Sequence, residues 1–207
     1  NSYIKKNPNS KEGYLLRAFI NTYDLSEFDK ALEDVDKAIE IDESYAIAYA
    51  LKSDIFYFDI GGSASQTKKM LNKAFELSPD DPYINFVKGD FYYDDSFILL
   101  DKDKKELAIK SAEKALIHFK KVVENSENNE DLIIKRIYPL GITYTAIALL
   151  GEAKFELYFM YKDIRDRKTA KTYLEEALID YTKAISMAPS QEKAEEIELD
   201  RDFDLIT

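Results

Sequence analysis

The chain has no cysteine, no tryptophan and a single histidine among its 207 residues. Without cysteine it can form no disulfide, thiolate metal site or thiol nucleophile, and the redox compartment cannot be inferred. The one histidine, His118, lies within a helical pattern and is predicted to be a helical surface residue. A lone histidine provides neither a metal site nor a nucleophile–base pair. We therefore expect no metal, no cofactor, no catalytic residue and no enzymatic activity.

Long apolar runs and basic charge are also scarce. No apolar run approaches the roughly 20 residues that a membrane span needs, since Tyr144–Leu150 is followed by Gly151 and Glu152. The net charge is −11, with 29 Lys and Arg against 40 Asp and Glu. This charge opposes nucleic acid and anionic lipid, whose binding depends on basic side chains. We expect a protein or peptide partner, no nucleic acid and no membrane insertion by this segment.

The sequence begins at Asn1, without methionine and without a basic and then apolar leader. This start suggests an excised fragment or a processed mature chain. The compartment is then cytoplasmic or, if a leader was removed, periplasmic or otherwise extracytoplasmic.

Glycine and proline are few, with six and five residues, and between them apolar residues recur three and four positions apart. This spacing predicts helices. One pattern of a small, a large and a small residue recurs four times along the chain, always on one helix face, where it would let a neighbouring helix approach closely. The copies are Ala31, Val35 and Ala38; Thr67, Leu71 and Ala74; Ala115, Phe119 and Val122; and Ala177, Tyr181 and Ala184.

This pattern resembles the second helix of the tetratricopeptide repeat (TPR), a helix-turn-helix unit of about 34 residues that ends in proline. Pro79 and Pro189 stand at the closing position of two copies, and Glu43 and Glu127 replace it in the others. The first helix of a TPR carries a small residue where two helices touch. The residues that match it are Ala18, Ser53, Gly89 and Gly141.

The resemblance implies an all-α fold, a right-handed superhelical solenoid of about four TPR-like units. We expect a single domain, 1–207, with units at approximately 8–43, 44–79, 80–128 and 129–189. The Glu-rich segment 190–200 predicts a C-terminal capping helix, because a solenoid needs a polar face at its end.

The third and fourth units are longer than a standard repeat. In the fourth, residues 146–160 and 169–185 keep helical spacing, which predicts two extended helices with a tip near Asp163–Lys168. In the third, the apolar residues Phe97–Leu100 lie between two acidic stretches. They predict a loop or short helix folded back onto the stack, or a contact with a partner.

In TPR proteins the first helices line a concave groove, and the resemblance places ten residues of this chain there. They are Phe19, Tyr23, Asp54, Tyr57, Phe58, Phe86, Asp90, Tyr93, Tyr138 and Ile142. Some family members use Lys, Arg and Asn in the groove to hold a C-terminal carboxylate, whereas this chain has aromatic and acidic residues. That composition suits a segment with apolar and basic residues, with Asp54 and Asp90 pairing the charges. Aromatic residues at helical spacing also suit a helix core, so each position has both interpretations.

The function expected from these features is a non-catalytic scaffold that binds a peptide segment or partner protein in an acidic and aromatic groove. One alternative is a structural module that self-associates into a homo-oligomer through the fourth hairpin and Phe97–Leu100. A second alternative is an auxiliary domain of a larger enzyme or of a secretion or envelope assembly.

Overall fold

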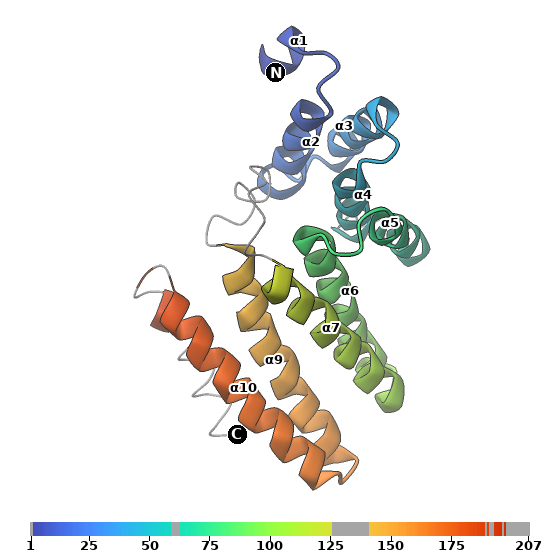
Figure 1. The fold of residues 1–207 in the computed structure, drawn as a ribbon. Coiled ribbons are helices and arrows are strands. Elements are labelled where there is room, and N and C mark those ends of the chain that lie inside the picture. The colour runs from blue at the N-terminus through green and yellow to red at the C-terminus, as the bar shows by residue number, and fades with distance from the viewer. Residues whose placement is uncertain are drawn as a thin grey trace. The chain divides into compact units, whose positions relative to one another are not determined.

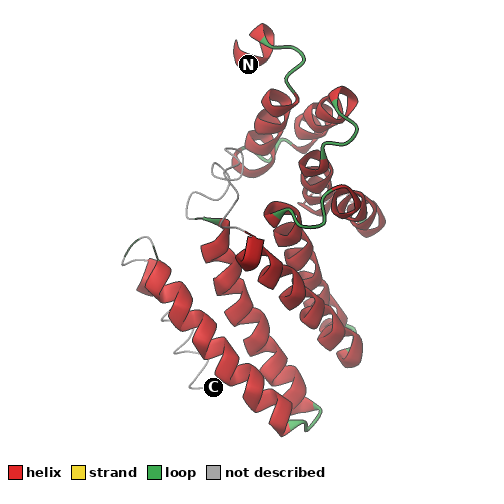
Figure 2. Ribbon diagram, viewed as in Figure 1, coloured by secondary structure: helices red, strands yellow, loops and turns green. Residues whose placement is uncertain are grey.

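A computed structural model describes residues 2–58, 63–125, 141–188, 190, 193–195 and 197 (Figure 1). These residues form helices and connecting loops, without a strand among them (Figure 2), which confirms the predicted all-α fold class. The elements are α1 (Ser2–Lys6), α2 (Lys11–Phe19), the π-helical turn η1 (Ile20–Asp24), α3 (Phe28–Ile41), α4 (Ala46–Phe58), α5 (Ala64–Leu77), α6 (Pro82–Asp101), α7 (Lys105–Asn125), α9 (Ile142–Asp163) and α10 (Arg167–Met187).

The chain forms two compact units, unit 1 (1–87) and unit 2 (88–207), with the boundary inside α6. In unit 1, α2 pairs with α3, α3 contacts α4, and α4 pairs with α5. In unit 2, α9 pairs closely with α10, and α7 lies against α9. The single domain, the repeat boundaries and the handedness of the solenoid stay predictions.

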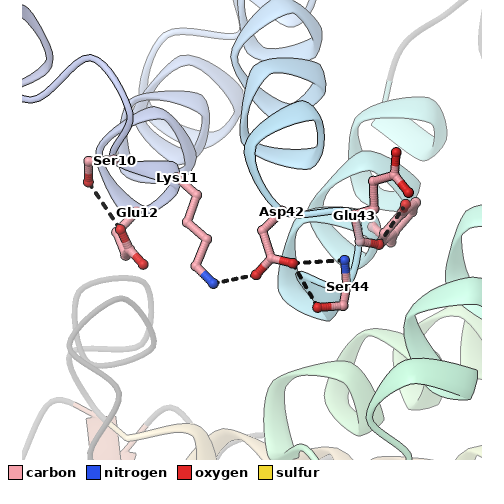
Figure 3. Close-up of polar contacts among 7 residues, drawn as sticks. Ser10, Lys11, Glu12, Asp42, Glu43 and Ser44 are labelled. Atoms are coloured by element: carbon pink, nitrogen blue, oxygen red, sulfur yellow. Dashed lines mark hydrogen bonds and ion pairs between the residues drawn. The ribbon is translucent and has the colours of Figure 1, made fainter.

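Short polar contacts define where the helices of unit 1 begin and end (Figure 3). Ser10 caps α2 by accepting a hydrogen bond from the Gly13 N–H. Asp42 follows the last residue of α3, and its carboxylate accepts hydrogen bonds from the Ser44 N–H and hydroxyl at 2.9 and 2.7 Å. The ammonium of Lys11, at 2.5 Å, and the Ser44 groups lower the pKa of Asp42 to about 2. This carboxylate therefore joins the start of α2 to the end of α3.

The recurring pattern of small, large and small residues forms the buried face of each second helix. Every residue of the four copies is 0 to 3% exposed. The predicted small residue Gly89 lies directly against the ring of Phe119, because a Cβ atom built on Gly89 would approach that ring to 2.6 Å. The close helix contact predicted for Gly89 is thus present in the structure.

The same prediction is wrong for Gly141. This residue is exposed at the N-cap of α9, and a Cβ atom there would meet nothing within 4 Å. Its φ of +88° is one that glycine adopts readily and other residues adopt at a cost. The residue that meets Tyr181 is Gly151, whose Cβ would lie 2.9 Å from the ring. The extension of α9 and α10 moves the contact ten residues along the helix.

The two hairpins of unit 2 repeat each other with an offset of 62 residues, which relates Gly89 to Gly151 and Phe119 to Tyr181. The offset also relates the ends of α6 and α9 and the whole of α7 and α10. Both turns contain a residue with positive φ, Asp103 at 55° and Arg165 at 66°. The two elongated hairpins therefore share the same turn and second helices of equal length, 21 residues each in α7 and α10.

This equivalence corrects the prediction for the third unit. Phe97–Leu100 lies in the last turns of the continuous helix α6, and it is neither a loop nor a separate short helix. The flanking acidic residues did not end the helix, because aspartate is tolerated within helices. The residue with positive φ that follows α6 is Asp103, after the helix end at Asp101. The extended hairpin predicted for the fourth unit, with its tip near Asp163–Lys168, agrees with α9 and α10.

The predicted capping helix, 190–200, lies partly outside the described residues and stays a prediction. Lys193–Glu195 and Ile197 are helical. Ile197 is buried in a cluster of α9 and α10 residues that includes Tyr144, Phe155 and Tyr181. Ile197 therefore packs against the last hairpin.

Candidate protein-binding surface

Three exposed aromatic side chains of unit 1 touch one another. Tyr23 comes from η1, whereas Tyr57 and Phe58 end α4, and these side chains are 40, 40 and 47% exposed. The ring of Phe58 meets Tyr23 edge-on at 6.0 Å between centroids and Tyr57 at 5.5 Å. We call these three residues the aromatic surface. All of them were predicted from the sequence to line the groove.

Buried aromatic rings support this surface from below. Phe19 is 4% exposed and stacks on Tyr23 with centroids 5.9 Å apart. Tyr83, in the first turn of α6, is fully buried and meets Phe19 edge-on at 5.7 Å. Phe19 therefore contributes packing under the surface and little area for a partner.

The carboxylate of Asp54 connects three elements of the site. Its Oδ2 atom accepts hydrogen bonds from the Tyr23 hydroxyl at 2.5 Å and from the Tyr83 hydroxyl at 3.0 Å. Charged acceptors make stronger hydrogen bonds than neutral ones. Asp54 thus fixes a phenol from η1 and a phenol from α6 against α4, a role that its sequence position did not reveal. Its predicted pairing with a charge of the partner stays a prediction.

Tyr23 lies in the π-helical turn η1. The Leu25 N–H donates to the Ile20 carbonyl at 3.1 Å, a bond that spans five residues. The next residue, Ser26, has a φ of 54°. Such turns are rare and are often found at functional sites. From this turn, Tyr23 stacks on Phe19 and reaches Asp54.

The remaining predicted groove residues are distributed differently. Phe86, in unit 1, is 7% exposed, and Ile142, at the start of α9 in unit 2, is 5% exposed. Tyr93 of unit 2 is partly exposed and meets Phe97 edge-on at 5.0 Å. Tyr138 lies outside the described residues. The contacts in unit 1 therefore bring together Phe19, Tyr23, Asp54, Tyr57 and Phe58.

Tyr83 belongs to the site but was missed by sequence reasoning. The repeat pattern of the first helices begins at Asn85 in this helix, and Tyr83 lies before it. The only local signal was its place directly after Pro82, a residue favoured at the first position of helices. That signal predicts a helix start and gives no information about a buried phenol.

The structure also corrects the expectation for His118, which is buried at 8% exposure and is not a surface residue. Its ring stacks on Tyr92 of α6 with centroids 5.7 Å apart. Burial, with the nearby Lys88 and Lys121, lowers the pKa of His118 to about 4. The imidazole is therefore neutral at physiological pH and acts as a packing residue between α6 and α7.

Asp90 provides a pH-dependent test of unit 2. Burial, followed by the like charge of Asp94, raises the pKa of Asp90 to about 6 from 3.8. The folded state then binds the proton more tightly than the unfolded state, so the stability due to Asp90 is lost as pH rises from about 4 to about 6. We expect Asp90→Asn to raise the free energy of unfolding by about 2 kcal/mol at pH 7.5 and by much less at pH 4.

Urea unfolding at the two pH values, followed by circular dichroism, would measure this difference between Asp90→Asn and the wild type. An equal effect of the substitution at both pH values would show that Asp90 is solvated in the folded chain. A destabilising effect at pH 7.5 would show that the carboxylate has a stabilising partner.

The part of the chain that the structure describes contains neither a metal-binding cluster nor a membrane-spanning helix. No group of three or more His, Cys, Asp or Glu side chains there is arranged to hold a metal ion. Within the same residues, no helix has both the length and the apolar character required to cross a bilayer.

Comparison with known proteins gives matches in structure and none in sequence. No protein-family model matches the chain, and no curated protein matches it. The crystal structure of MamA matches 88% of this chain and 84% of its own, with a TM-score of 0.50 and 18% identity. The structure of YrrB, described as a TPR protein with an unusual peptide-binding site, matches 95% of this chain and 96% of its own, with a TM-score of 0.44 and 18% identity. MamA is also a TPR protein, and its likeness to this chain, together with the buried repeat faces, shows that the chain has a TPR-type fold.

Proposed function

We propose that the protein is an interaction scaffold whose unit 1 binds a segment of another protein at the aromatic surface. The observation that carries this proposal is the contact of the exposed Phe58 ring with two further exposed rings, Tyr23 and Tyr57. Single exposed apolar residues are common on proteins, whereas a contiguous exposed group marks an interaction site.

The surface is held in place before a partner arrives. Tyr23 is stacked on Phe19 and bonded to Asp54, and Phe58 rests against Tyr23. A partner therefore does not have to immobilise these rings, which lowers the entropic cost of binding. Tyrosine also provides a large contact area with few rotatable bonds, and it is enriched among the residues that dominate binding energies.

The partner segment should combine apolar with basic residues. The aromatic faces attract Lys and Arg through cation–π contacts. Asp54 adds a negative charge next to Tyr23, and the whole chain has a net charge of −11. Long-range attraction would steer a basic segment to the protein, and the rings would provide most of the contact area.

Selection from a random peptide library displayed on phage, with the full chain as bait, tests the proposal. We expect enriched peptides that carry Lys or Arg beside apolar residues. Their affinity, measured by fluorescence anisotropy of labelled peptides, should fall at least roughly tenfold for Tyr57→Ser/Phe58→Ser, because truncation of central aromatic residues costs 2 kcal/mol or more. Both side chains are exposed, so the variant should fold normally.

The matched control is Ile117→Ser/Ile179→Ser, which removes two exposed apolar side chains of α7 and α10 in unit 2, 57 and 67% exposed. This control should bind the selected peptides like the wild type. If the peptides bind Tyr57→Ser/Phe58→Ser with unchanged affinity, or if only acidic peptides are selected, the proposed site is wrong.

A further inference from the structure

The turns of the two hairpins in unit 2 form a second exposed surface, which we call the hairpin tips, residues 101–107 and 162–168. Every residue of these two segments is exposed. The Lys105 ammonium lies 3.3 Å from the Asp163 carboxylate and so connects one tip to the other. The tips therefore present one surface, built from the end of α6, the start of α7 and the turn between α9 and α10.

Apolar side chains project from this surface. Leu107 and Ile164 lie within the tips and are 50 and 46% exposed, and Ile98 in the last turn of α6 is 45% exposed. Ile98 and Leu107 lie in the helix turns on either side of the first tip, and Ile164 lies in the turn of the second. Exposed apolar residues at two turns that an ion pair joins provide the apolar part of a contact surface.

The tips are basic, although the chain as a whole is acidic. They contain more Lys and Arg than Asp and Glu, and the cations are Lys102, Lys104, Lys105, Lys162, Arg165, Arg167 and Lys168. The count is seven cations against five carboxylates, and one cation and one carboxylate of the tips pair with each other. Asp163 pairs with Lys105, and Asp166 accepts hydrogen bonds from the Thr169 N–H and hydroxyl at 3.1 and 2.7 Å.

The local charge determines which partner the tips attract. Salt screens exposed charges that are more than about 8 Å apart at physiological ionic strength. The acidic residues elsewhere in the chain therefore have little effect on a contact made at the tips. The net charge of −11 argues against anionic lipid for the chain as a whole, and this argument does not apply to the tips.

We infer that the hairpin tips bind the surface of an anionic lipid bilayer. The apolar side chains of Ile98, Leu107 and Ile164 would enter the headgroup region, and the surrounding Lys and Arg would contact lipid phosphates. A surface that combines exposed apolar residues with an excess of cations complements a negatively charged interface. This contact is peripheral and uses no membrane-spanning helix.

The inference does not depend on the aromatic surface. The residues of the hairpin tips belong to unit 2, whereas those of the aromatic surface belong to unit 1. A scaffold with both properties would hold its protein partner at a membrane. The failure of either proposal would leave the other unaffected.

Co-sedimentation of the full chain with vesicles tests the inference directly. We expect binding to phosphatidylcholine vesicles that contain phosphatidylserine, no binding to pure phosphatidylcholine vesicles, and loss of binding as salt rises from about 0.1 to about 0.5 M. Arg165→Glu/Arg167→Glu should weaken the partition coefficient at least roughly 30-fold, because each basic residue near such a surface contributes about a factor of five or more. Leu107→Ser/Ile164→Ser should also weaken it.

Two control variants with normal binding would locate the effect at the tips. Lys68→Glu/Lys69→Glu reverses two exposed charges of α5 in unit 1, and Ile117→Ser/Ile179→Ser removes exposed apolar residues far from the turns in the sequence. Equal sedimentation with neutral vesicles, or equal losses in the control and tip variants, would overturn the inference. Binding of an acidic peptide without any vesicle binding would also overturn it, and would assign the tips to a protein partner.

Discussion

Replacing Gly89 with valine is expected to lower the free energy of unfolding by about 3 kcal/mol. A Cβ atom at this position would lie 2.6 Å from the ring of Phe119, closer than any ordinary contact. Phe119 is fully buried and cannot move aside without displacing other core residues. Helices α6 and α7 would have to separate, and the gain in helix propensity from losing a glycine is much smaller. Chemical denaturation followed by circular dichroism would measure the loss.

A double variant distinguishes this collision from a general intolerance of α6. Phe119→Leu shortens the side chain that Gly89 faces, so Gly89→Val/Phe119→Leu should be less destabilised than the sum of the two single variants. Strict additivity would show that the two residues are not in contact. Gly151→Val should behave like Gly89→Val, because Gly151 faces Tyr181 in the same way.

Removing the ammonium of Lys154 is expected to cost a similar amount. Lys154 is 6% exposed on α9, and its Nζ lies 2.6 Å from Asp180 and 3.1 Å from Glu176 of α10. The Asp180 side chain is itself only 15% exposed. Lys154→Ala would leave this carboxylate nearly buried and without its cation, at a cost of about 3 kcal/mol.

The pair can be tested further by replacing both partners. Lys154→Met/Asp180→Leu exchanges the buried charges for apolar groups of similar size, and it should recover most of the stability lost in Lys154→Ala. Denaturation midpoints of the wild type and the variants would show this. A loss below about 1 kcal/mol in Lys154→Ala would mean that water reaches the pair and that it resembles an exposed ion pair.

The sequence predicted the helical repeat well because its signal is periodic and redundant. The buried face of each second helix follows from three residues at fixed spacing, and every copy repeats that information. The prediction from sequence was wrong where the length of the helices determines which residues of two paired helices face each other. Gly141 and Gly151 are each followed by an aromatic residue, Tyr144 and Phe155, so the local pattern fits both. Only the extension of α9 and α10 determines that Gly151 is the glycine that lies against Tyr181.

The candidate site was predicted in part. Tyr23, Tyr57 and Phe58 were selected by helical spacing, and the structure brings them into contact. Spacing cannot reveal that Asp54 accepts hydrogen bonds from Tyr23 and Tyr83, because these bonds join residues about 30 positions apart in the chain. It also gives no signal for η1, since π-helical turns are rare and a spacing of three and four residues predicts an α-helix.

The added turns of each long hairpin in unit 2 are shielded from solvent by the other hairpin. Gly89 and Ala115 are 26 residues apart, whereas the corresponding Ser53 and Thr67 of unit 1 are 14 apart. Each arm is therefore about six residues, or about 9 Å, longer than in unit 1. The Tyr161 hydroxyl at the far end of α9 donates to Glu113 of α7 at 2.7 Å, so the added turns of one hairpin shield those of the next. An insertion or deletion confined to one hairpin would expose apolar side chains on the helices of the other hairpin. We therefore expect the two hairpin lengths to change only together.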